Sequence, residues 1–141
     1  MNAEFEMQLN SGIAAFESKQ FAQSMQMLSP LAEQGNAESQ YRMAIMLQNG
    51  LGMVANEAKA LVYMQGAAEQ GHALALHGLG FMYLEGECTE KDPAQAAVYF
   101  RQAADLGLAG SLTTLASLYE QGLGVEQNIE EAQRLYKLAG F

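Results

Sequence analysis

Few side chains in this sequence combine a reactive type with the spacing that chemistry requires. His72 and His77 stand five residues apart, so on a helix they diverge by more than a right angle and cannot share a ligand or a proton. We expect His72 to be a solvated residue at the start of a helix. Cys88 is flanked by carboxylates that disfavour its thiolate, so we do not expect it to act as a nucleophile.

A second candidate site is a group of carboxylates, whose oxygen atoms are the ligands that hard cations prefer. The group comprises Glu85, Glu87, Glu90 and Asp92. Its spacing lacks the twelve-residue pattern of a calcium loop, and a hydrated connector explains it more simply. The sequence also has no glycine-rich phosphate loop following a strand. These observations predict a non-enzymatic protein with no cofactor and no metal.

The composition narrows the choice of partners. Sixteen Asp and Glu against seven Lys and Arg give the 141 residues a net charge of −9, and such a field repels phosphate backbones and anionic lipid. We therefore expect neither nucleic acid nor membrane as a partner. No apolar run approaches the ~20 residues of a membrane span. The N-terminus lacks the features of a secretory signal, and the single cysteine cannot form an internal disulfide, so we expect a cytoplasmic protein.

The strongest pattern in the chain is internal repetition with a period of 36 residues. Five columns keep this register: Gly35, Gly71 and Gly107; Gly50, Gly86 and Gly122; Ala37, Ala73 and Ala109; Ala60, Ala96 and Ala132; and Ala67, Ala103 and Ala139. They define three repeats, residues 36–71, 72–107 and 108–141, which follow an atypical segment of residues 1–35. We expect residues 1–141 to form a single solenoid domain.

Each repeat predicts two helices and no strand. Apolar residues at steps of three and four, such as Leu76, Leu79 and Tyr83 of the second repeat, lie on one face of a helix. That helix ends at the glycine of the second column, because glycine enters the left-handed conformation of a C-cap without a side-chain penalty. The N-caps predicted for the second helix are Asn56, Asp92 and Asn128. Pro93 then suits the first helical position.

Small and aromatic residues of the second repeat form a pattern that points to a known family. The pattern consists of Ala73, Leu79, Gly80, Tyr83, Gly86, Ala96, Tyr99, Phe100, Ala103, Ala104 and Gly107. It resembles the Sel1-like repeats, relatives of the tetratricopeptide repeat, whose connector glycines also stand at Gly50 and Gly52 and at Gly122 and Gly124. The second connector departs from the pattern, with Cys88 in place of a glycine. The resemblance implies an all-α fold, a right-handed α/α superhelical solenoid of about eight antiparallel helices, and an adaptor or scaffold role, often in bacterial signalling.

The segments that flank the repeats predict how the array ends. Residues 1–35 contain a helical stripe of Phe5, Leu9, Gly12, Ile13 and Phe16, followed by a second helix from Phe21 to Glu33. We interpret this helical pair as an N-terminal cap. At the other end, Gln133 and Arg134 replace the apolar pairs Leu61 and Val62 and Ala97 and Val98, so we expect the earlier pairs to be covered by a following repeat and the last to be exposed. Leu138 and Phe141 form a small apolar patch that would suit a homodimer.

We expect a partner to bind in a concave groove lined by the first helix of each repeat. The positions left after packing are Glu38, Tyr41, Ile45, Gln48, Asn49, Leu74, His77, Phe81, Leu84, Glu85, Thr113, Ser117, Glu120 and Gln121. Apolar anchors stand at the centre and carboxylates at the rim. Because none of these positions is Lys or Arg, the groove does not suit a carboxyl terminus. The predicted partner is a protein or peptide, neutral or basic, with apolar side chains.

Two alternatives stay open at this point. The same spacing allows Tyr41 and His77, and equally Ile45 and Phe81, to pack between neighbouring repeats instead of facing the groove. The alternative function is that of a structural spacer, or of a homodimerising component of an assembly, which would use its ends.

Overall fold

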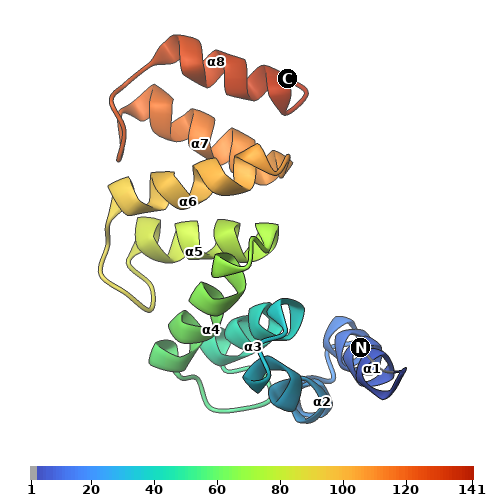
Figure 1. Ribbon diagram of the computed structural model, residues 1–141. Coiled ribbons are helices and arrows are strands. Elements are labelled where there is room, and N and C mark those ends of the chain that lie inside the picture. The colour runs from blue at the N-terminus through green and yellow to red at the C-terminus, as the bar shows by residue number, and fades with distance from the viewer. Residues whose placement is uncertain (1–2) are drawn as a thin grey trace. The chain divides into compact units, whose positions relative to one another are not determined.

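A computed structural model describes residues 3–141, which form eight α-helices and no strand (Figure 1). The helices are α1 (Ala3–Glu17), α2 (Phe21–Glu33), α3 (Ala37–Asn49), α4 (Glu57–Glu69), α5 (Ala73–Glu85), α6 (Pro93–Asp105), α7 (Ala109–Gln121) and α8 (Ile129–Leu138). The prediction of an all-α fold with eight helices is confirmed. Residues 1 and 2, with which the predicted N-terminal segment begins, lie outside the described residues.

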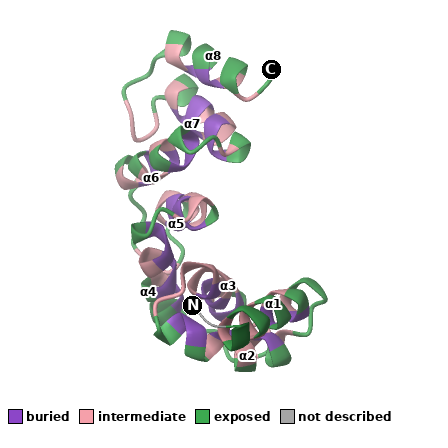
Figure 2. Cartoon of the chain, turned by 45° about the vertical axis from the view of Figure 1, so that its right-hand side comes forward, coloured by how far each residue is buried: buried purple, intermediate pink, exposed green. Residues whose placement is uncertain are grey.

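The chain divides into two compact units, Met1–His72 with α1 to α4 and Ala73–Phe141 with α5 to α8. Within each unit every helix packs against the next one along the chain. Buried residues lie on the faces that the helices turn toward these neighbours (Figure 2). Each unit thus has its own core.

The predicted helix caps are present in the structure. The side chains of Asn56, Asp92 and Asn128 accept hydrogen bonds from the backbone N–H three residues further on, at 3.1, 3.1 and 3.0 Å. The glycines that end α3 and α7, Gly50 and Gly122, have φ of 66° and 65°. Local sequence chemistry therefore sets where these helices begin and end.

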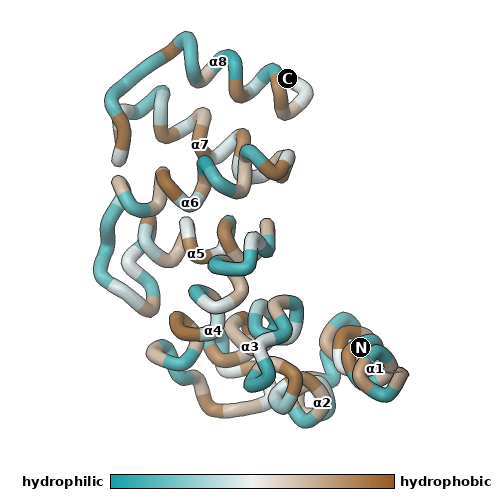
Figure 3. The backbone as a smooth tube through the Cα atoms, in the orientation of Figure 1, coloured by the Kyte–Doolittle hydropathy of each residue, from teal (hydrophilic) through white to brown (hydrophobic). Residues whose placement is uncertain are grey.

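Small residues of one helix receive large ones of its neighbour. Phe100 of α6 is fully buried, and its ring lies against Gly80 of α5, where a Cβ atom would stand 2.9 Å from the ring. Ala96 and Ala103, one turn to either side of Phe100, are also fully buried. Apolar residues recur along each helix in the same rhythm (Figure 3). This alternation of small and aromatic side chains explains the columns that repeat every 36 residues.

Two connector glycines hold successive helical pairs close together. A Cβ atom at Gly52 would stand 2.6 Å from the backbone nitrogen of Ala22 in α2, and one at Gly124 would overlap the backbone of Pro93 in α6. Both glycines also have positive φ, 72° and 75°. Cys88 occupies the same position in the second repeat and adopts φ 65° as well. The second connector therefore has a different side chain at this position but the same left-handed backbone as the other two.

The N-terminal helical pair follows the same packing logic. A Cβ atom at Gly12 of α1 would clash with the side chain of Leu28 in α2. Ser24 is fully buried, and its hydroxyl donates a hydrogen bond to the carbonyl oxygen of Gly12 at 2.8 Å. The predicted pair of helices is confirmed, and Ser24 satisfies a carbonyl that an alanine would not reach.

The expectation that a following repeat covers both residues of each apolar pair in α4 and α6 was wrong in part. Ala97 is buried, as expected, but Val62 and Val98 remain 63% and 47% exposed. The two residues of each pair point in directions about 100° apart around the helix, so only one of them faces a neighbouring helix. Arg134 therefore stands at a position that is exposed in every repeat, as Val62 and Val98 are. Gln133 stands at the position of Ala97, which is buried.

Candidate protein-binding surface

In the first unit, the ring of Tyr41 in α3 packs against the imidazole ring of His72. The Tyr41 and His72 rings lie 4.9 Å apart at an angle of 30°, and His72 Nε2 lies 2.6 Å from Glu38 Oε2. The expectation that His72 is solvated was wrong, because its side chain is only 16% exposed. Burial raises the pKa of the Tyr41 hydroxyl. Tyr41 therefore packs against the first residue of the following repeat, which favours the packing alternative, and presents only part of its ring.

Glu38 is a bound carboxylate rather than a free rim charge. Its Oε1 accepts a hydrogen bond from Arg42 Nε at 2.8 Å, and Arg42 also lies 3.6 Å from Glu17 and over the ring of Phe16. Burial raises the pKa of Glu38, but the hydrogen bonds from His72 and Arg42 outweigh it and hold the pKa below 4.5. Glu38 therefore differs from the free rim carboxylate that the sequence predicts.

The rest of the α3 set lies toward the end of that helix. Ile45 and Gln48 are half-buried and Asn49 is exposed. The Asn49 side-chain amide donates to the Ile45 carbonyl oxygen at 2.9 Å, one turn earlier on the same helix. These residues line one face of α3, with Ile45 as its apolar member.

In the second unit, α5 carries a cluster of three rings. His77 lies edge-on to Phe81 and to Phe100, with centroids 5.0 and 5.4 Å apart, and Phe81 lies 5.0 Å from Phe100. His77 Nδ1 is joined by a 2.7 Å hydrogen bond to the hydroxyl of Ser111, which is fully buried in α7. His77 thus ties α5 to α7, and the interpretation of His77 as a packing residue has the stronger support.

His77 predicts a pH dependence of stability. Burial lowers the pKa of His77 below 6.5, so the unfolded chain binds the proton more readily than the folded one. By linkage, the free energy of unfolding then falls as the pH drops from 6.5 toward the lower, folded-state pKa. In urea denaturation at pH 7 and pH 5.5, we expect His77→Asn to lose less stability than the wild type. Equal losses in both proteins would contradict this role.

Beside this cluster, α5 and α7 leave part of the predicted set accessible. Leu74 is 44% exposed, and Phe81 and Leu84 are half-buried at the edge of the core. On α7, Thr113 and Ser117 are half-buried. The His77–Ser111 bond joins α5 to α7, and we call the partly exposed residues of the predicted set on these two helices the α5–α7 surface.

Of the two carboxylates predicted at the rim of the α5–α7 surface, Glu120 has a hydrogen-bond partner that was not predicted. Glu85 is exposed, but the Glu120 carboxylate accepts a hydrogen bond from the Tyr136 hydroxyl at 2.6 Å, which raises the pKa of Tyr136. Gln121 donates to the Ser117 hydroxyl at 2.7 Å. The rim therefore keeps its negative charge, with Glu120 fixed in position and Glu85 facing solvent.

The sequence did not predict a hollow that lies in the second unit. It has a volume of about 320 Å³ and is lined by Ala94, Ala97, Val98, Arg101, Gln102, Leu115, Tyr119, Gly124 and Val125. Arg101 crosses from α6 to donate to Glu131 at 2.8 Å and to the Tyr119 hydroxyl at 3.0 Å. The hydrogen bond from Arg134 and then that from Arg101 lower the pKa of Glu131 to about 2. Of its lining residues, Ala97 and Val98 were expected as an outer-face pair, and no hollow was expected beside them.

Within residues 3–141, no three His, Cys, Asp or Glu side chains lie close enough together to hold a metal ion. In the same part of the chain, no helix is both long and apolar enough to cross a membrane. The described residues form packed helices with partly exposed side faces.

Comparisons with known proteins agree with this geometry. The Sel1 repeat family matches residues 37–72, 73–108 and 111–140, each within three residues of the repeat boundaries predicted from the sequence. Sel1-repeat proteins generally mediate protein–protein interactions, and the fold is that of a scaffold. Among curated proteins, none shows significant similarity to this chain.

Solved structures with the same fold are larger than this chain in two cases. A Sel1 repeat protein from Oxalobacter formigenes is 30% identical, with a TM-score of 0.87 over 93% of this chain and 54% of its own length. A protective antigen of uropathogenic Escherichia coli strains, described as having an SLR fold, is 29% identical, with a TM-score of 0.89 over 96% of this chain and 30% of its own.

A third structure shows the fold alone. Cysteine-rich protein B of Helicobacter pylori is 21% identical and has a TM-score of 0.66 over 86% of this chain and 87% of its own length. The repeat matches cover well over half of the 141 residues. The chain therefore belongs to the Sel1 repeat family.

Proposed function

We propose that this chain is an adaptor that binds a segment of another protein on the α5–α7 surface. The observation that carries the proposal is the accessible apolar group of Leu74, Phe81 and Leu84, of which Leu74 is 44% exposed. The rings of His77 and Phe100 hold Phe81 from behind, so it is preorganised and loses little side-chain entropy on binding. Rigid aromatic side chains of this kind are common anchors in interfaces.

The charge of the surface indicates the chemistry of the segment. None of the α5 and α7 members of the predicted set is Lys or Arg, and Glu85 and Glu120 border the surface. The whole chain carries a net charge of −9. A neutral or basic segment with apolar side chains would bind with favourable electrostatics, whereas an acidic one would be repelled.

Selection of displayed peptides on the wild-type protein, followed by fluorescence anisotropy, tests the proposal. We expect selected peptides to combine apolar anchors with Lys or Arg, and Phe81→Ala to weaken their binding by about 1–3 kcal/mol. Leu74→Ala should weaken binding as well. Leu106→Ala is the matched control, because Leu106 is similarly exposed, at 57%, and belongs to neither α5 nor α7.

Two results would contradict the proposal. One is a preference for acidic peptides. The other is a loss of affinity in Leu106→Ala as large as that in Leu74→Ala. Circular dichroism of each variant must show unchanged helix content, since Phe81 also packs against the core.

A further inference from the structure

One side of the last helix, α8, is exposed, although the equivalent side of α6 is covered by the helix that follows it. In α6, Ala97, Phe100 and Ala104 form one core cluster with residues of α7 and are at most 5% exposed. The residues 36 positions later, on and just beyond α8, are Gln133, Tyr136 and Gly140, of which two are exposed and one is half-buried. The side of α8 that corresponds to the seat of α7 is therefore uncovered by the described residues.

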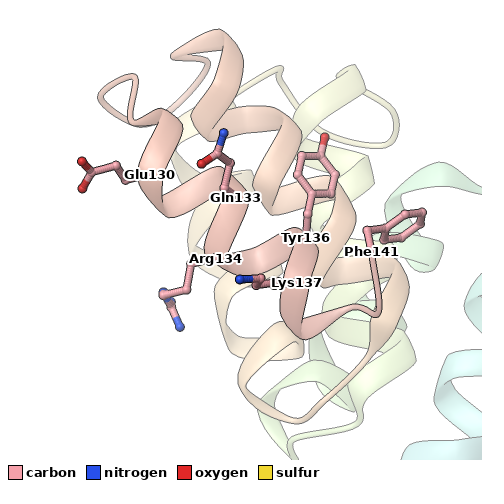
Figure 4. A pocket seen from close by; sticks show the side chains of 6 residues that line it. All are labelled: Glu130, Gln133, Arg134, Tyr136, Lys137 and Phe141. Carbon is pink, nitrogen blue, oxygen red and sulfur yellow. The ribbon is translucent and has the colours of Figure 1, made fainter.

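The uncovered side of α8 is hollowed. A depression of about 550 Å³ is lined by Glu130, Gln133, Arg134, Tyr136, Lys137 and Phe141 (Figure 4). Phe141 is 81% exposed, and its ring lies edge-on to Tyr136 with centroids 6.1 Å apart. Leu138 is 61% exposed. We call this side, defined by the six lining residues and Leu138, the α8 seat.

The first helix carries the complementary face. Counted from their last residues, α1, α3, α5 and α7 are equivalent, and the position ten residues before the end is Met7, Ser39, Ala75 and Ser111, respectively. The last three are fully buried, whereas Met7 is 68% exposed. The same holds three residues before the end, where Met46, Met82 and Leu118 are buried and Ala14 is exposed. We call the exposed side of α1 that contains Met7, Ser11 and Ala14 the α1 face.

Lys137 gives the α8 seat a charge opposite to that of the α1 face. In α1 the first turn contains Glu4 and Glu6, and the helix has no Lys or Arg. In the α8 seat Arg134 pairs with Glu131 of the same helix at 2.6 Å, and Lys137 and Glu130 also line the depression. Apolar side chains lie beside these charges on both surfaces, Met7 on one and Phe141 on the other. Opposite charge around an apolar contact favours one docking register over others.

We propose that the α8 seat of one copy of this chain binds the α1 face of a second copy, in the way that α6 receives α7 within the second unit. The contact is heterologous, because different surfaces of the two copies meet. A dimer formed in this way still has one free α1 face and one free α8 seat, so further copies can add. The inference goes beyond the proposed function, since it uses neither α5 nor α7.

Sedimentation velocity over a range of protein concentrations tests the inference with charge reversal. Wild-type protein should show a weight-average mass that rises with concentration. Lys137→Glu and the double variant Glu4→Lys, Glu6→Lys should each raise the dissociation constant about tenfold or more. An equimolar mixture of these two proteins should associate again, because each supplies the surface that the other lacks.

A matched control separates local contact from net charge. Lys91→Glu changes the net charge as much as Lys137→Glu does, but Lys91 lies in the connector between α5 and α6, so it should leave association unchanged. A wild-type protein that stays monomeric at every concentration would overturn the inference. So would association that both reversals leave intact, or that Lys91→Glu weakens as much as Lys137→Glu. Leu74→Ala should leave association unchanged, which keeps this test independent of peptide binding.

Discussion

Replacing Phe100 with alanine is expected to lower the free energy of unfolding of the second unit by about 3–5 kcal/mol. Phe100 is fully buried, and its ring contacts Gly80, His77 and Phe81. Because Gly80 has no side chain with which to refill the space, the cavity left by the ring would persist. Loss of contacts around a persisting cavity is the main cost of such substitutions.

Urea denaturation followed by circular dichroism measures the effect, and amide hydrogen exchange assigns it to α5–α8. Val98→Ala is the control, because Val98 lies in the same helix but is 47% exposed. We expect its effect to stay within about 0.5 kcal/mol. A loss for Phe100→Ala as small as that for Val98→Ala would show that the ring is not a structural centre of this unit.

Gly124→Ala is the second substitution with a large expected effect, a loss of about 2–5 kcal/mol. The added Cβ would overlap the backbone of Pro93 at the start of α6, so the connector and α6 would have to separate. The φ of 75° adds the cost of a side chain in the left-handed region, about 1–2 kcal/mol. Both costs fall on the second unit and should appear as a lower midpoint of denaturation.

Gly107→Ala separates the two costs. Gly107 has φ 88°, but a Cβ there would meet nothing within 4 Å. We therefore expect it to show only the backbone cost of about 1–2 kcal/mol. If Gly107→Ala and Gly124→Ala were equally destabilising, close approach of the connector to α6 would not contribute to stability.

The elements of this fold follow from local sequence chemistry, and for that reason they could be predicted. Asn56, Asp92 and Asn128 mark helix starts because a short polar side chain can accept a hydrogen bond from the backbone three residues on. Gly50 and Gly122 mark helix ends because φ near 65° suits glycine. Neither signal depends on any distant part of the chain.

The surface was harder to predict, because it depends on how each helix is rotated about its axis. A step of one residue turns the side chain by about 100°, so Val62 could not be separated from Leu61 by pattern alone. His72 seemed solvated because its partners, Glu38 and Tyr41, lie more than thirty residues away in the sequence. The apolar anchors proposed on α5 stay a prediction, and the hydrogen bond from His77 of α5 to Ser111 of α7 carries no sequence signal.

Within each unit, every helix packs against its immediate successor, which has a consequence for how the unit folds. Contacts such as that between Gln70 and Gly35 join residues only 35 positions apart, so little loop-closure entropy opposes them. Helical folds in which contacts join neighbouring elements fold on timescales of microseconds to milliseconds. Within a unit, a nucleus formed at one helical pair can then grow by adding the pair beside it.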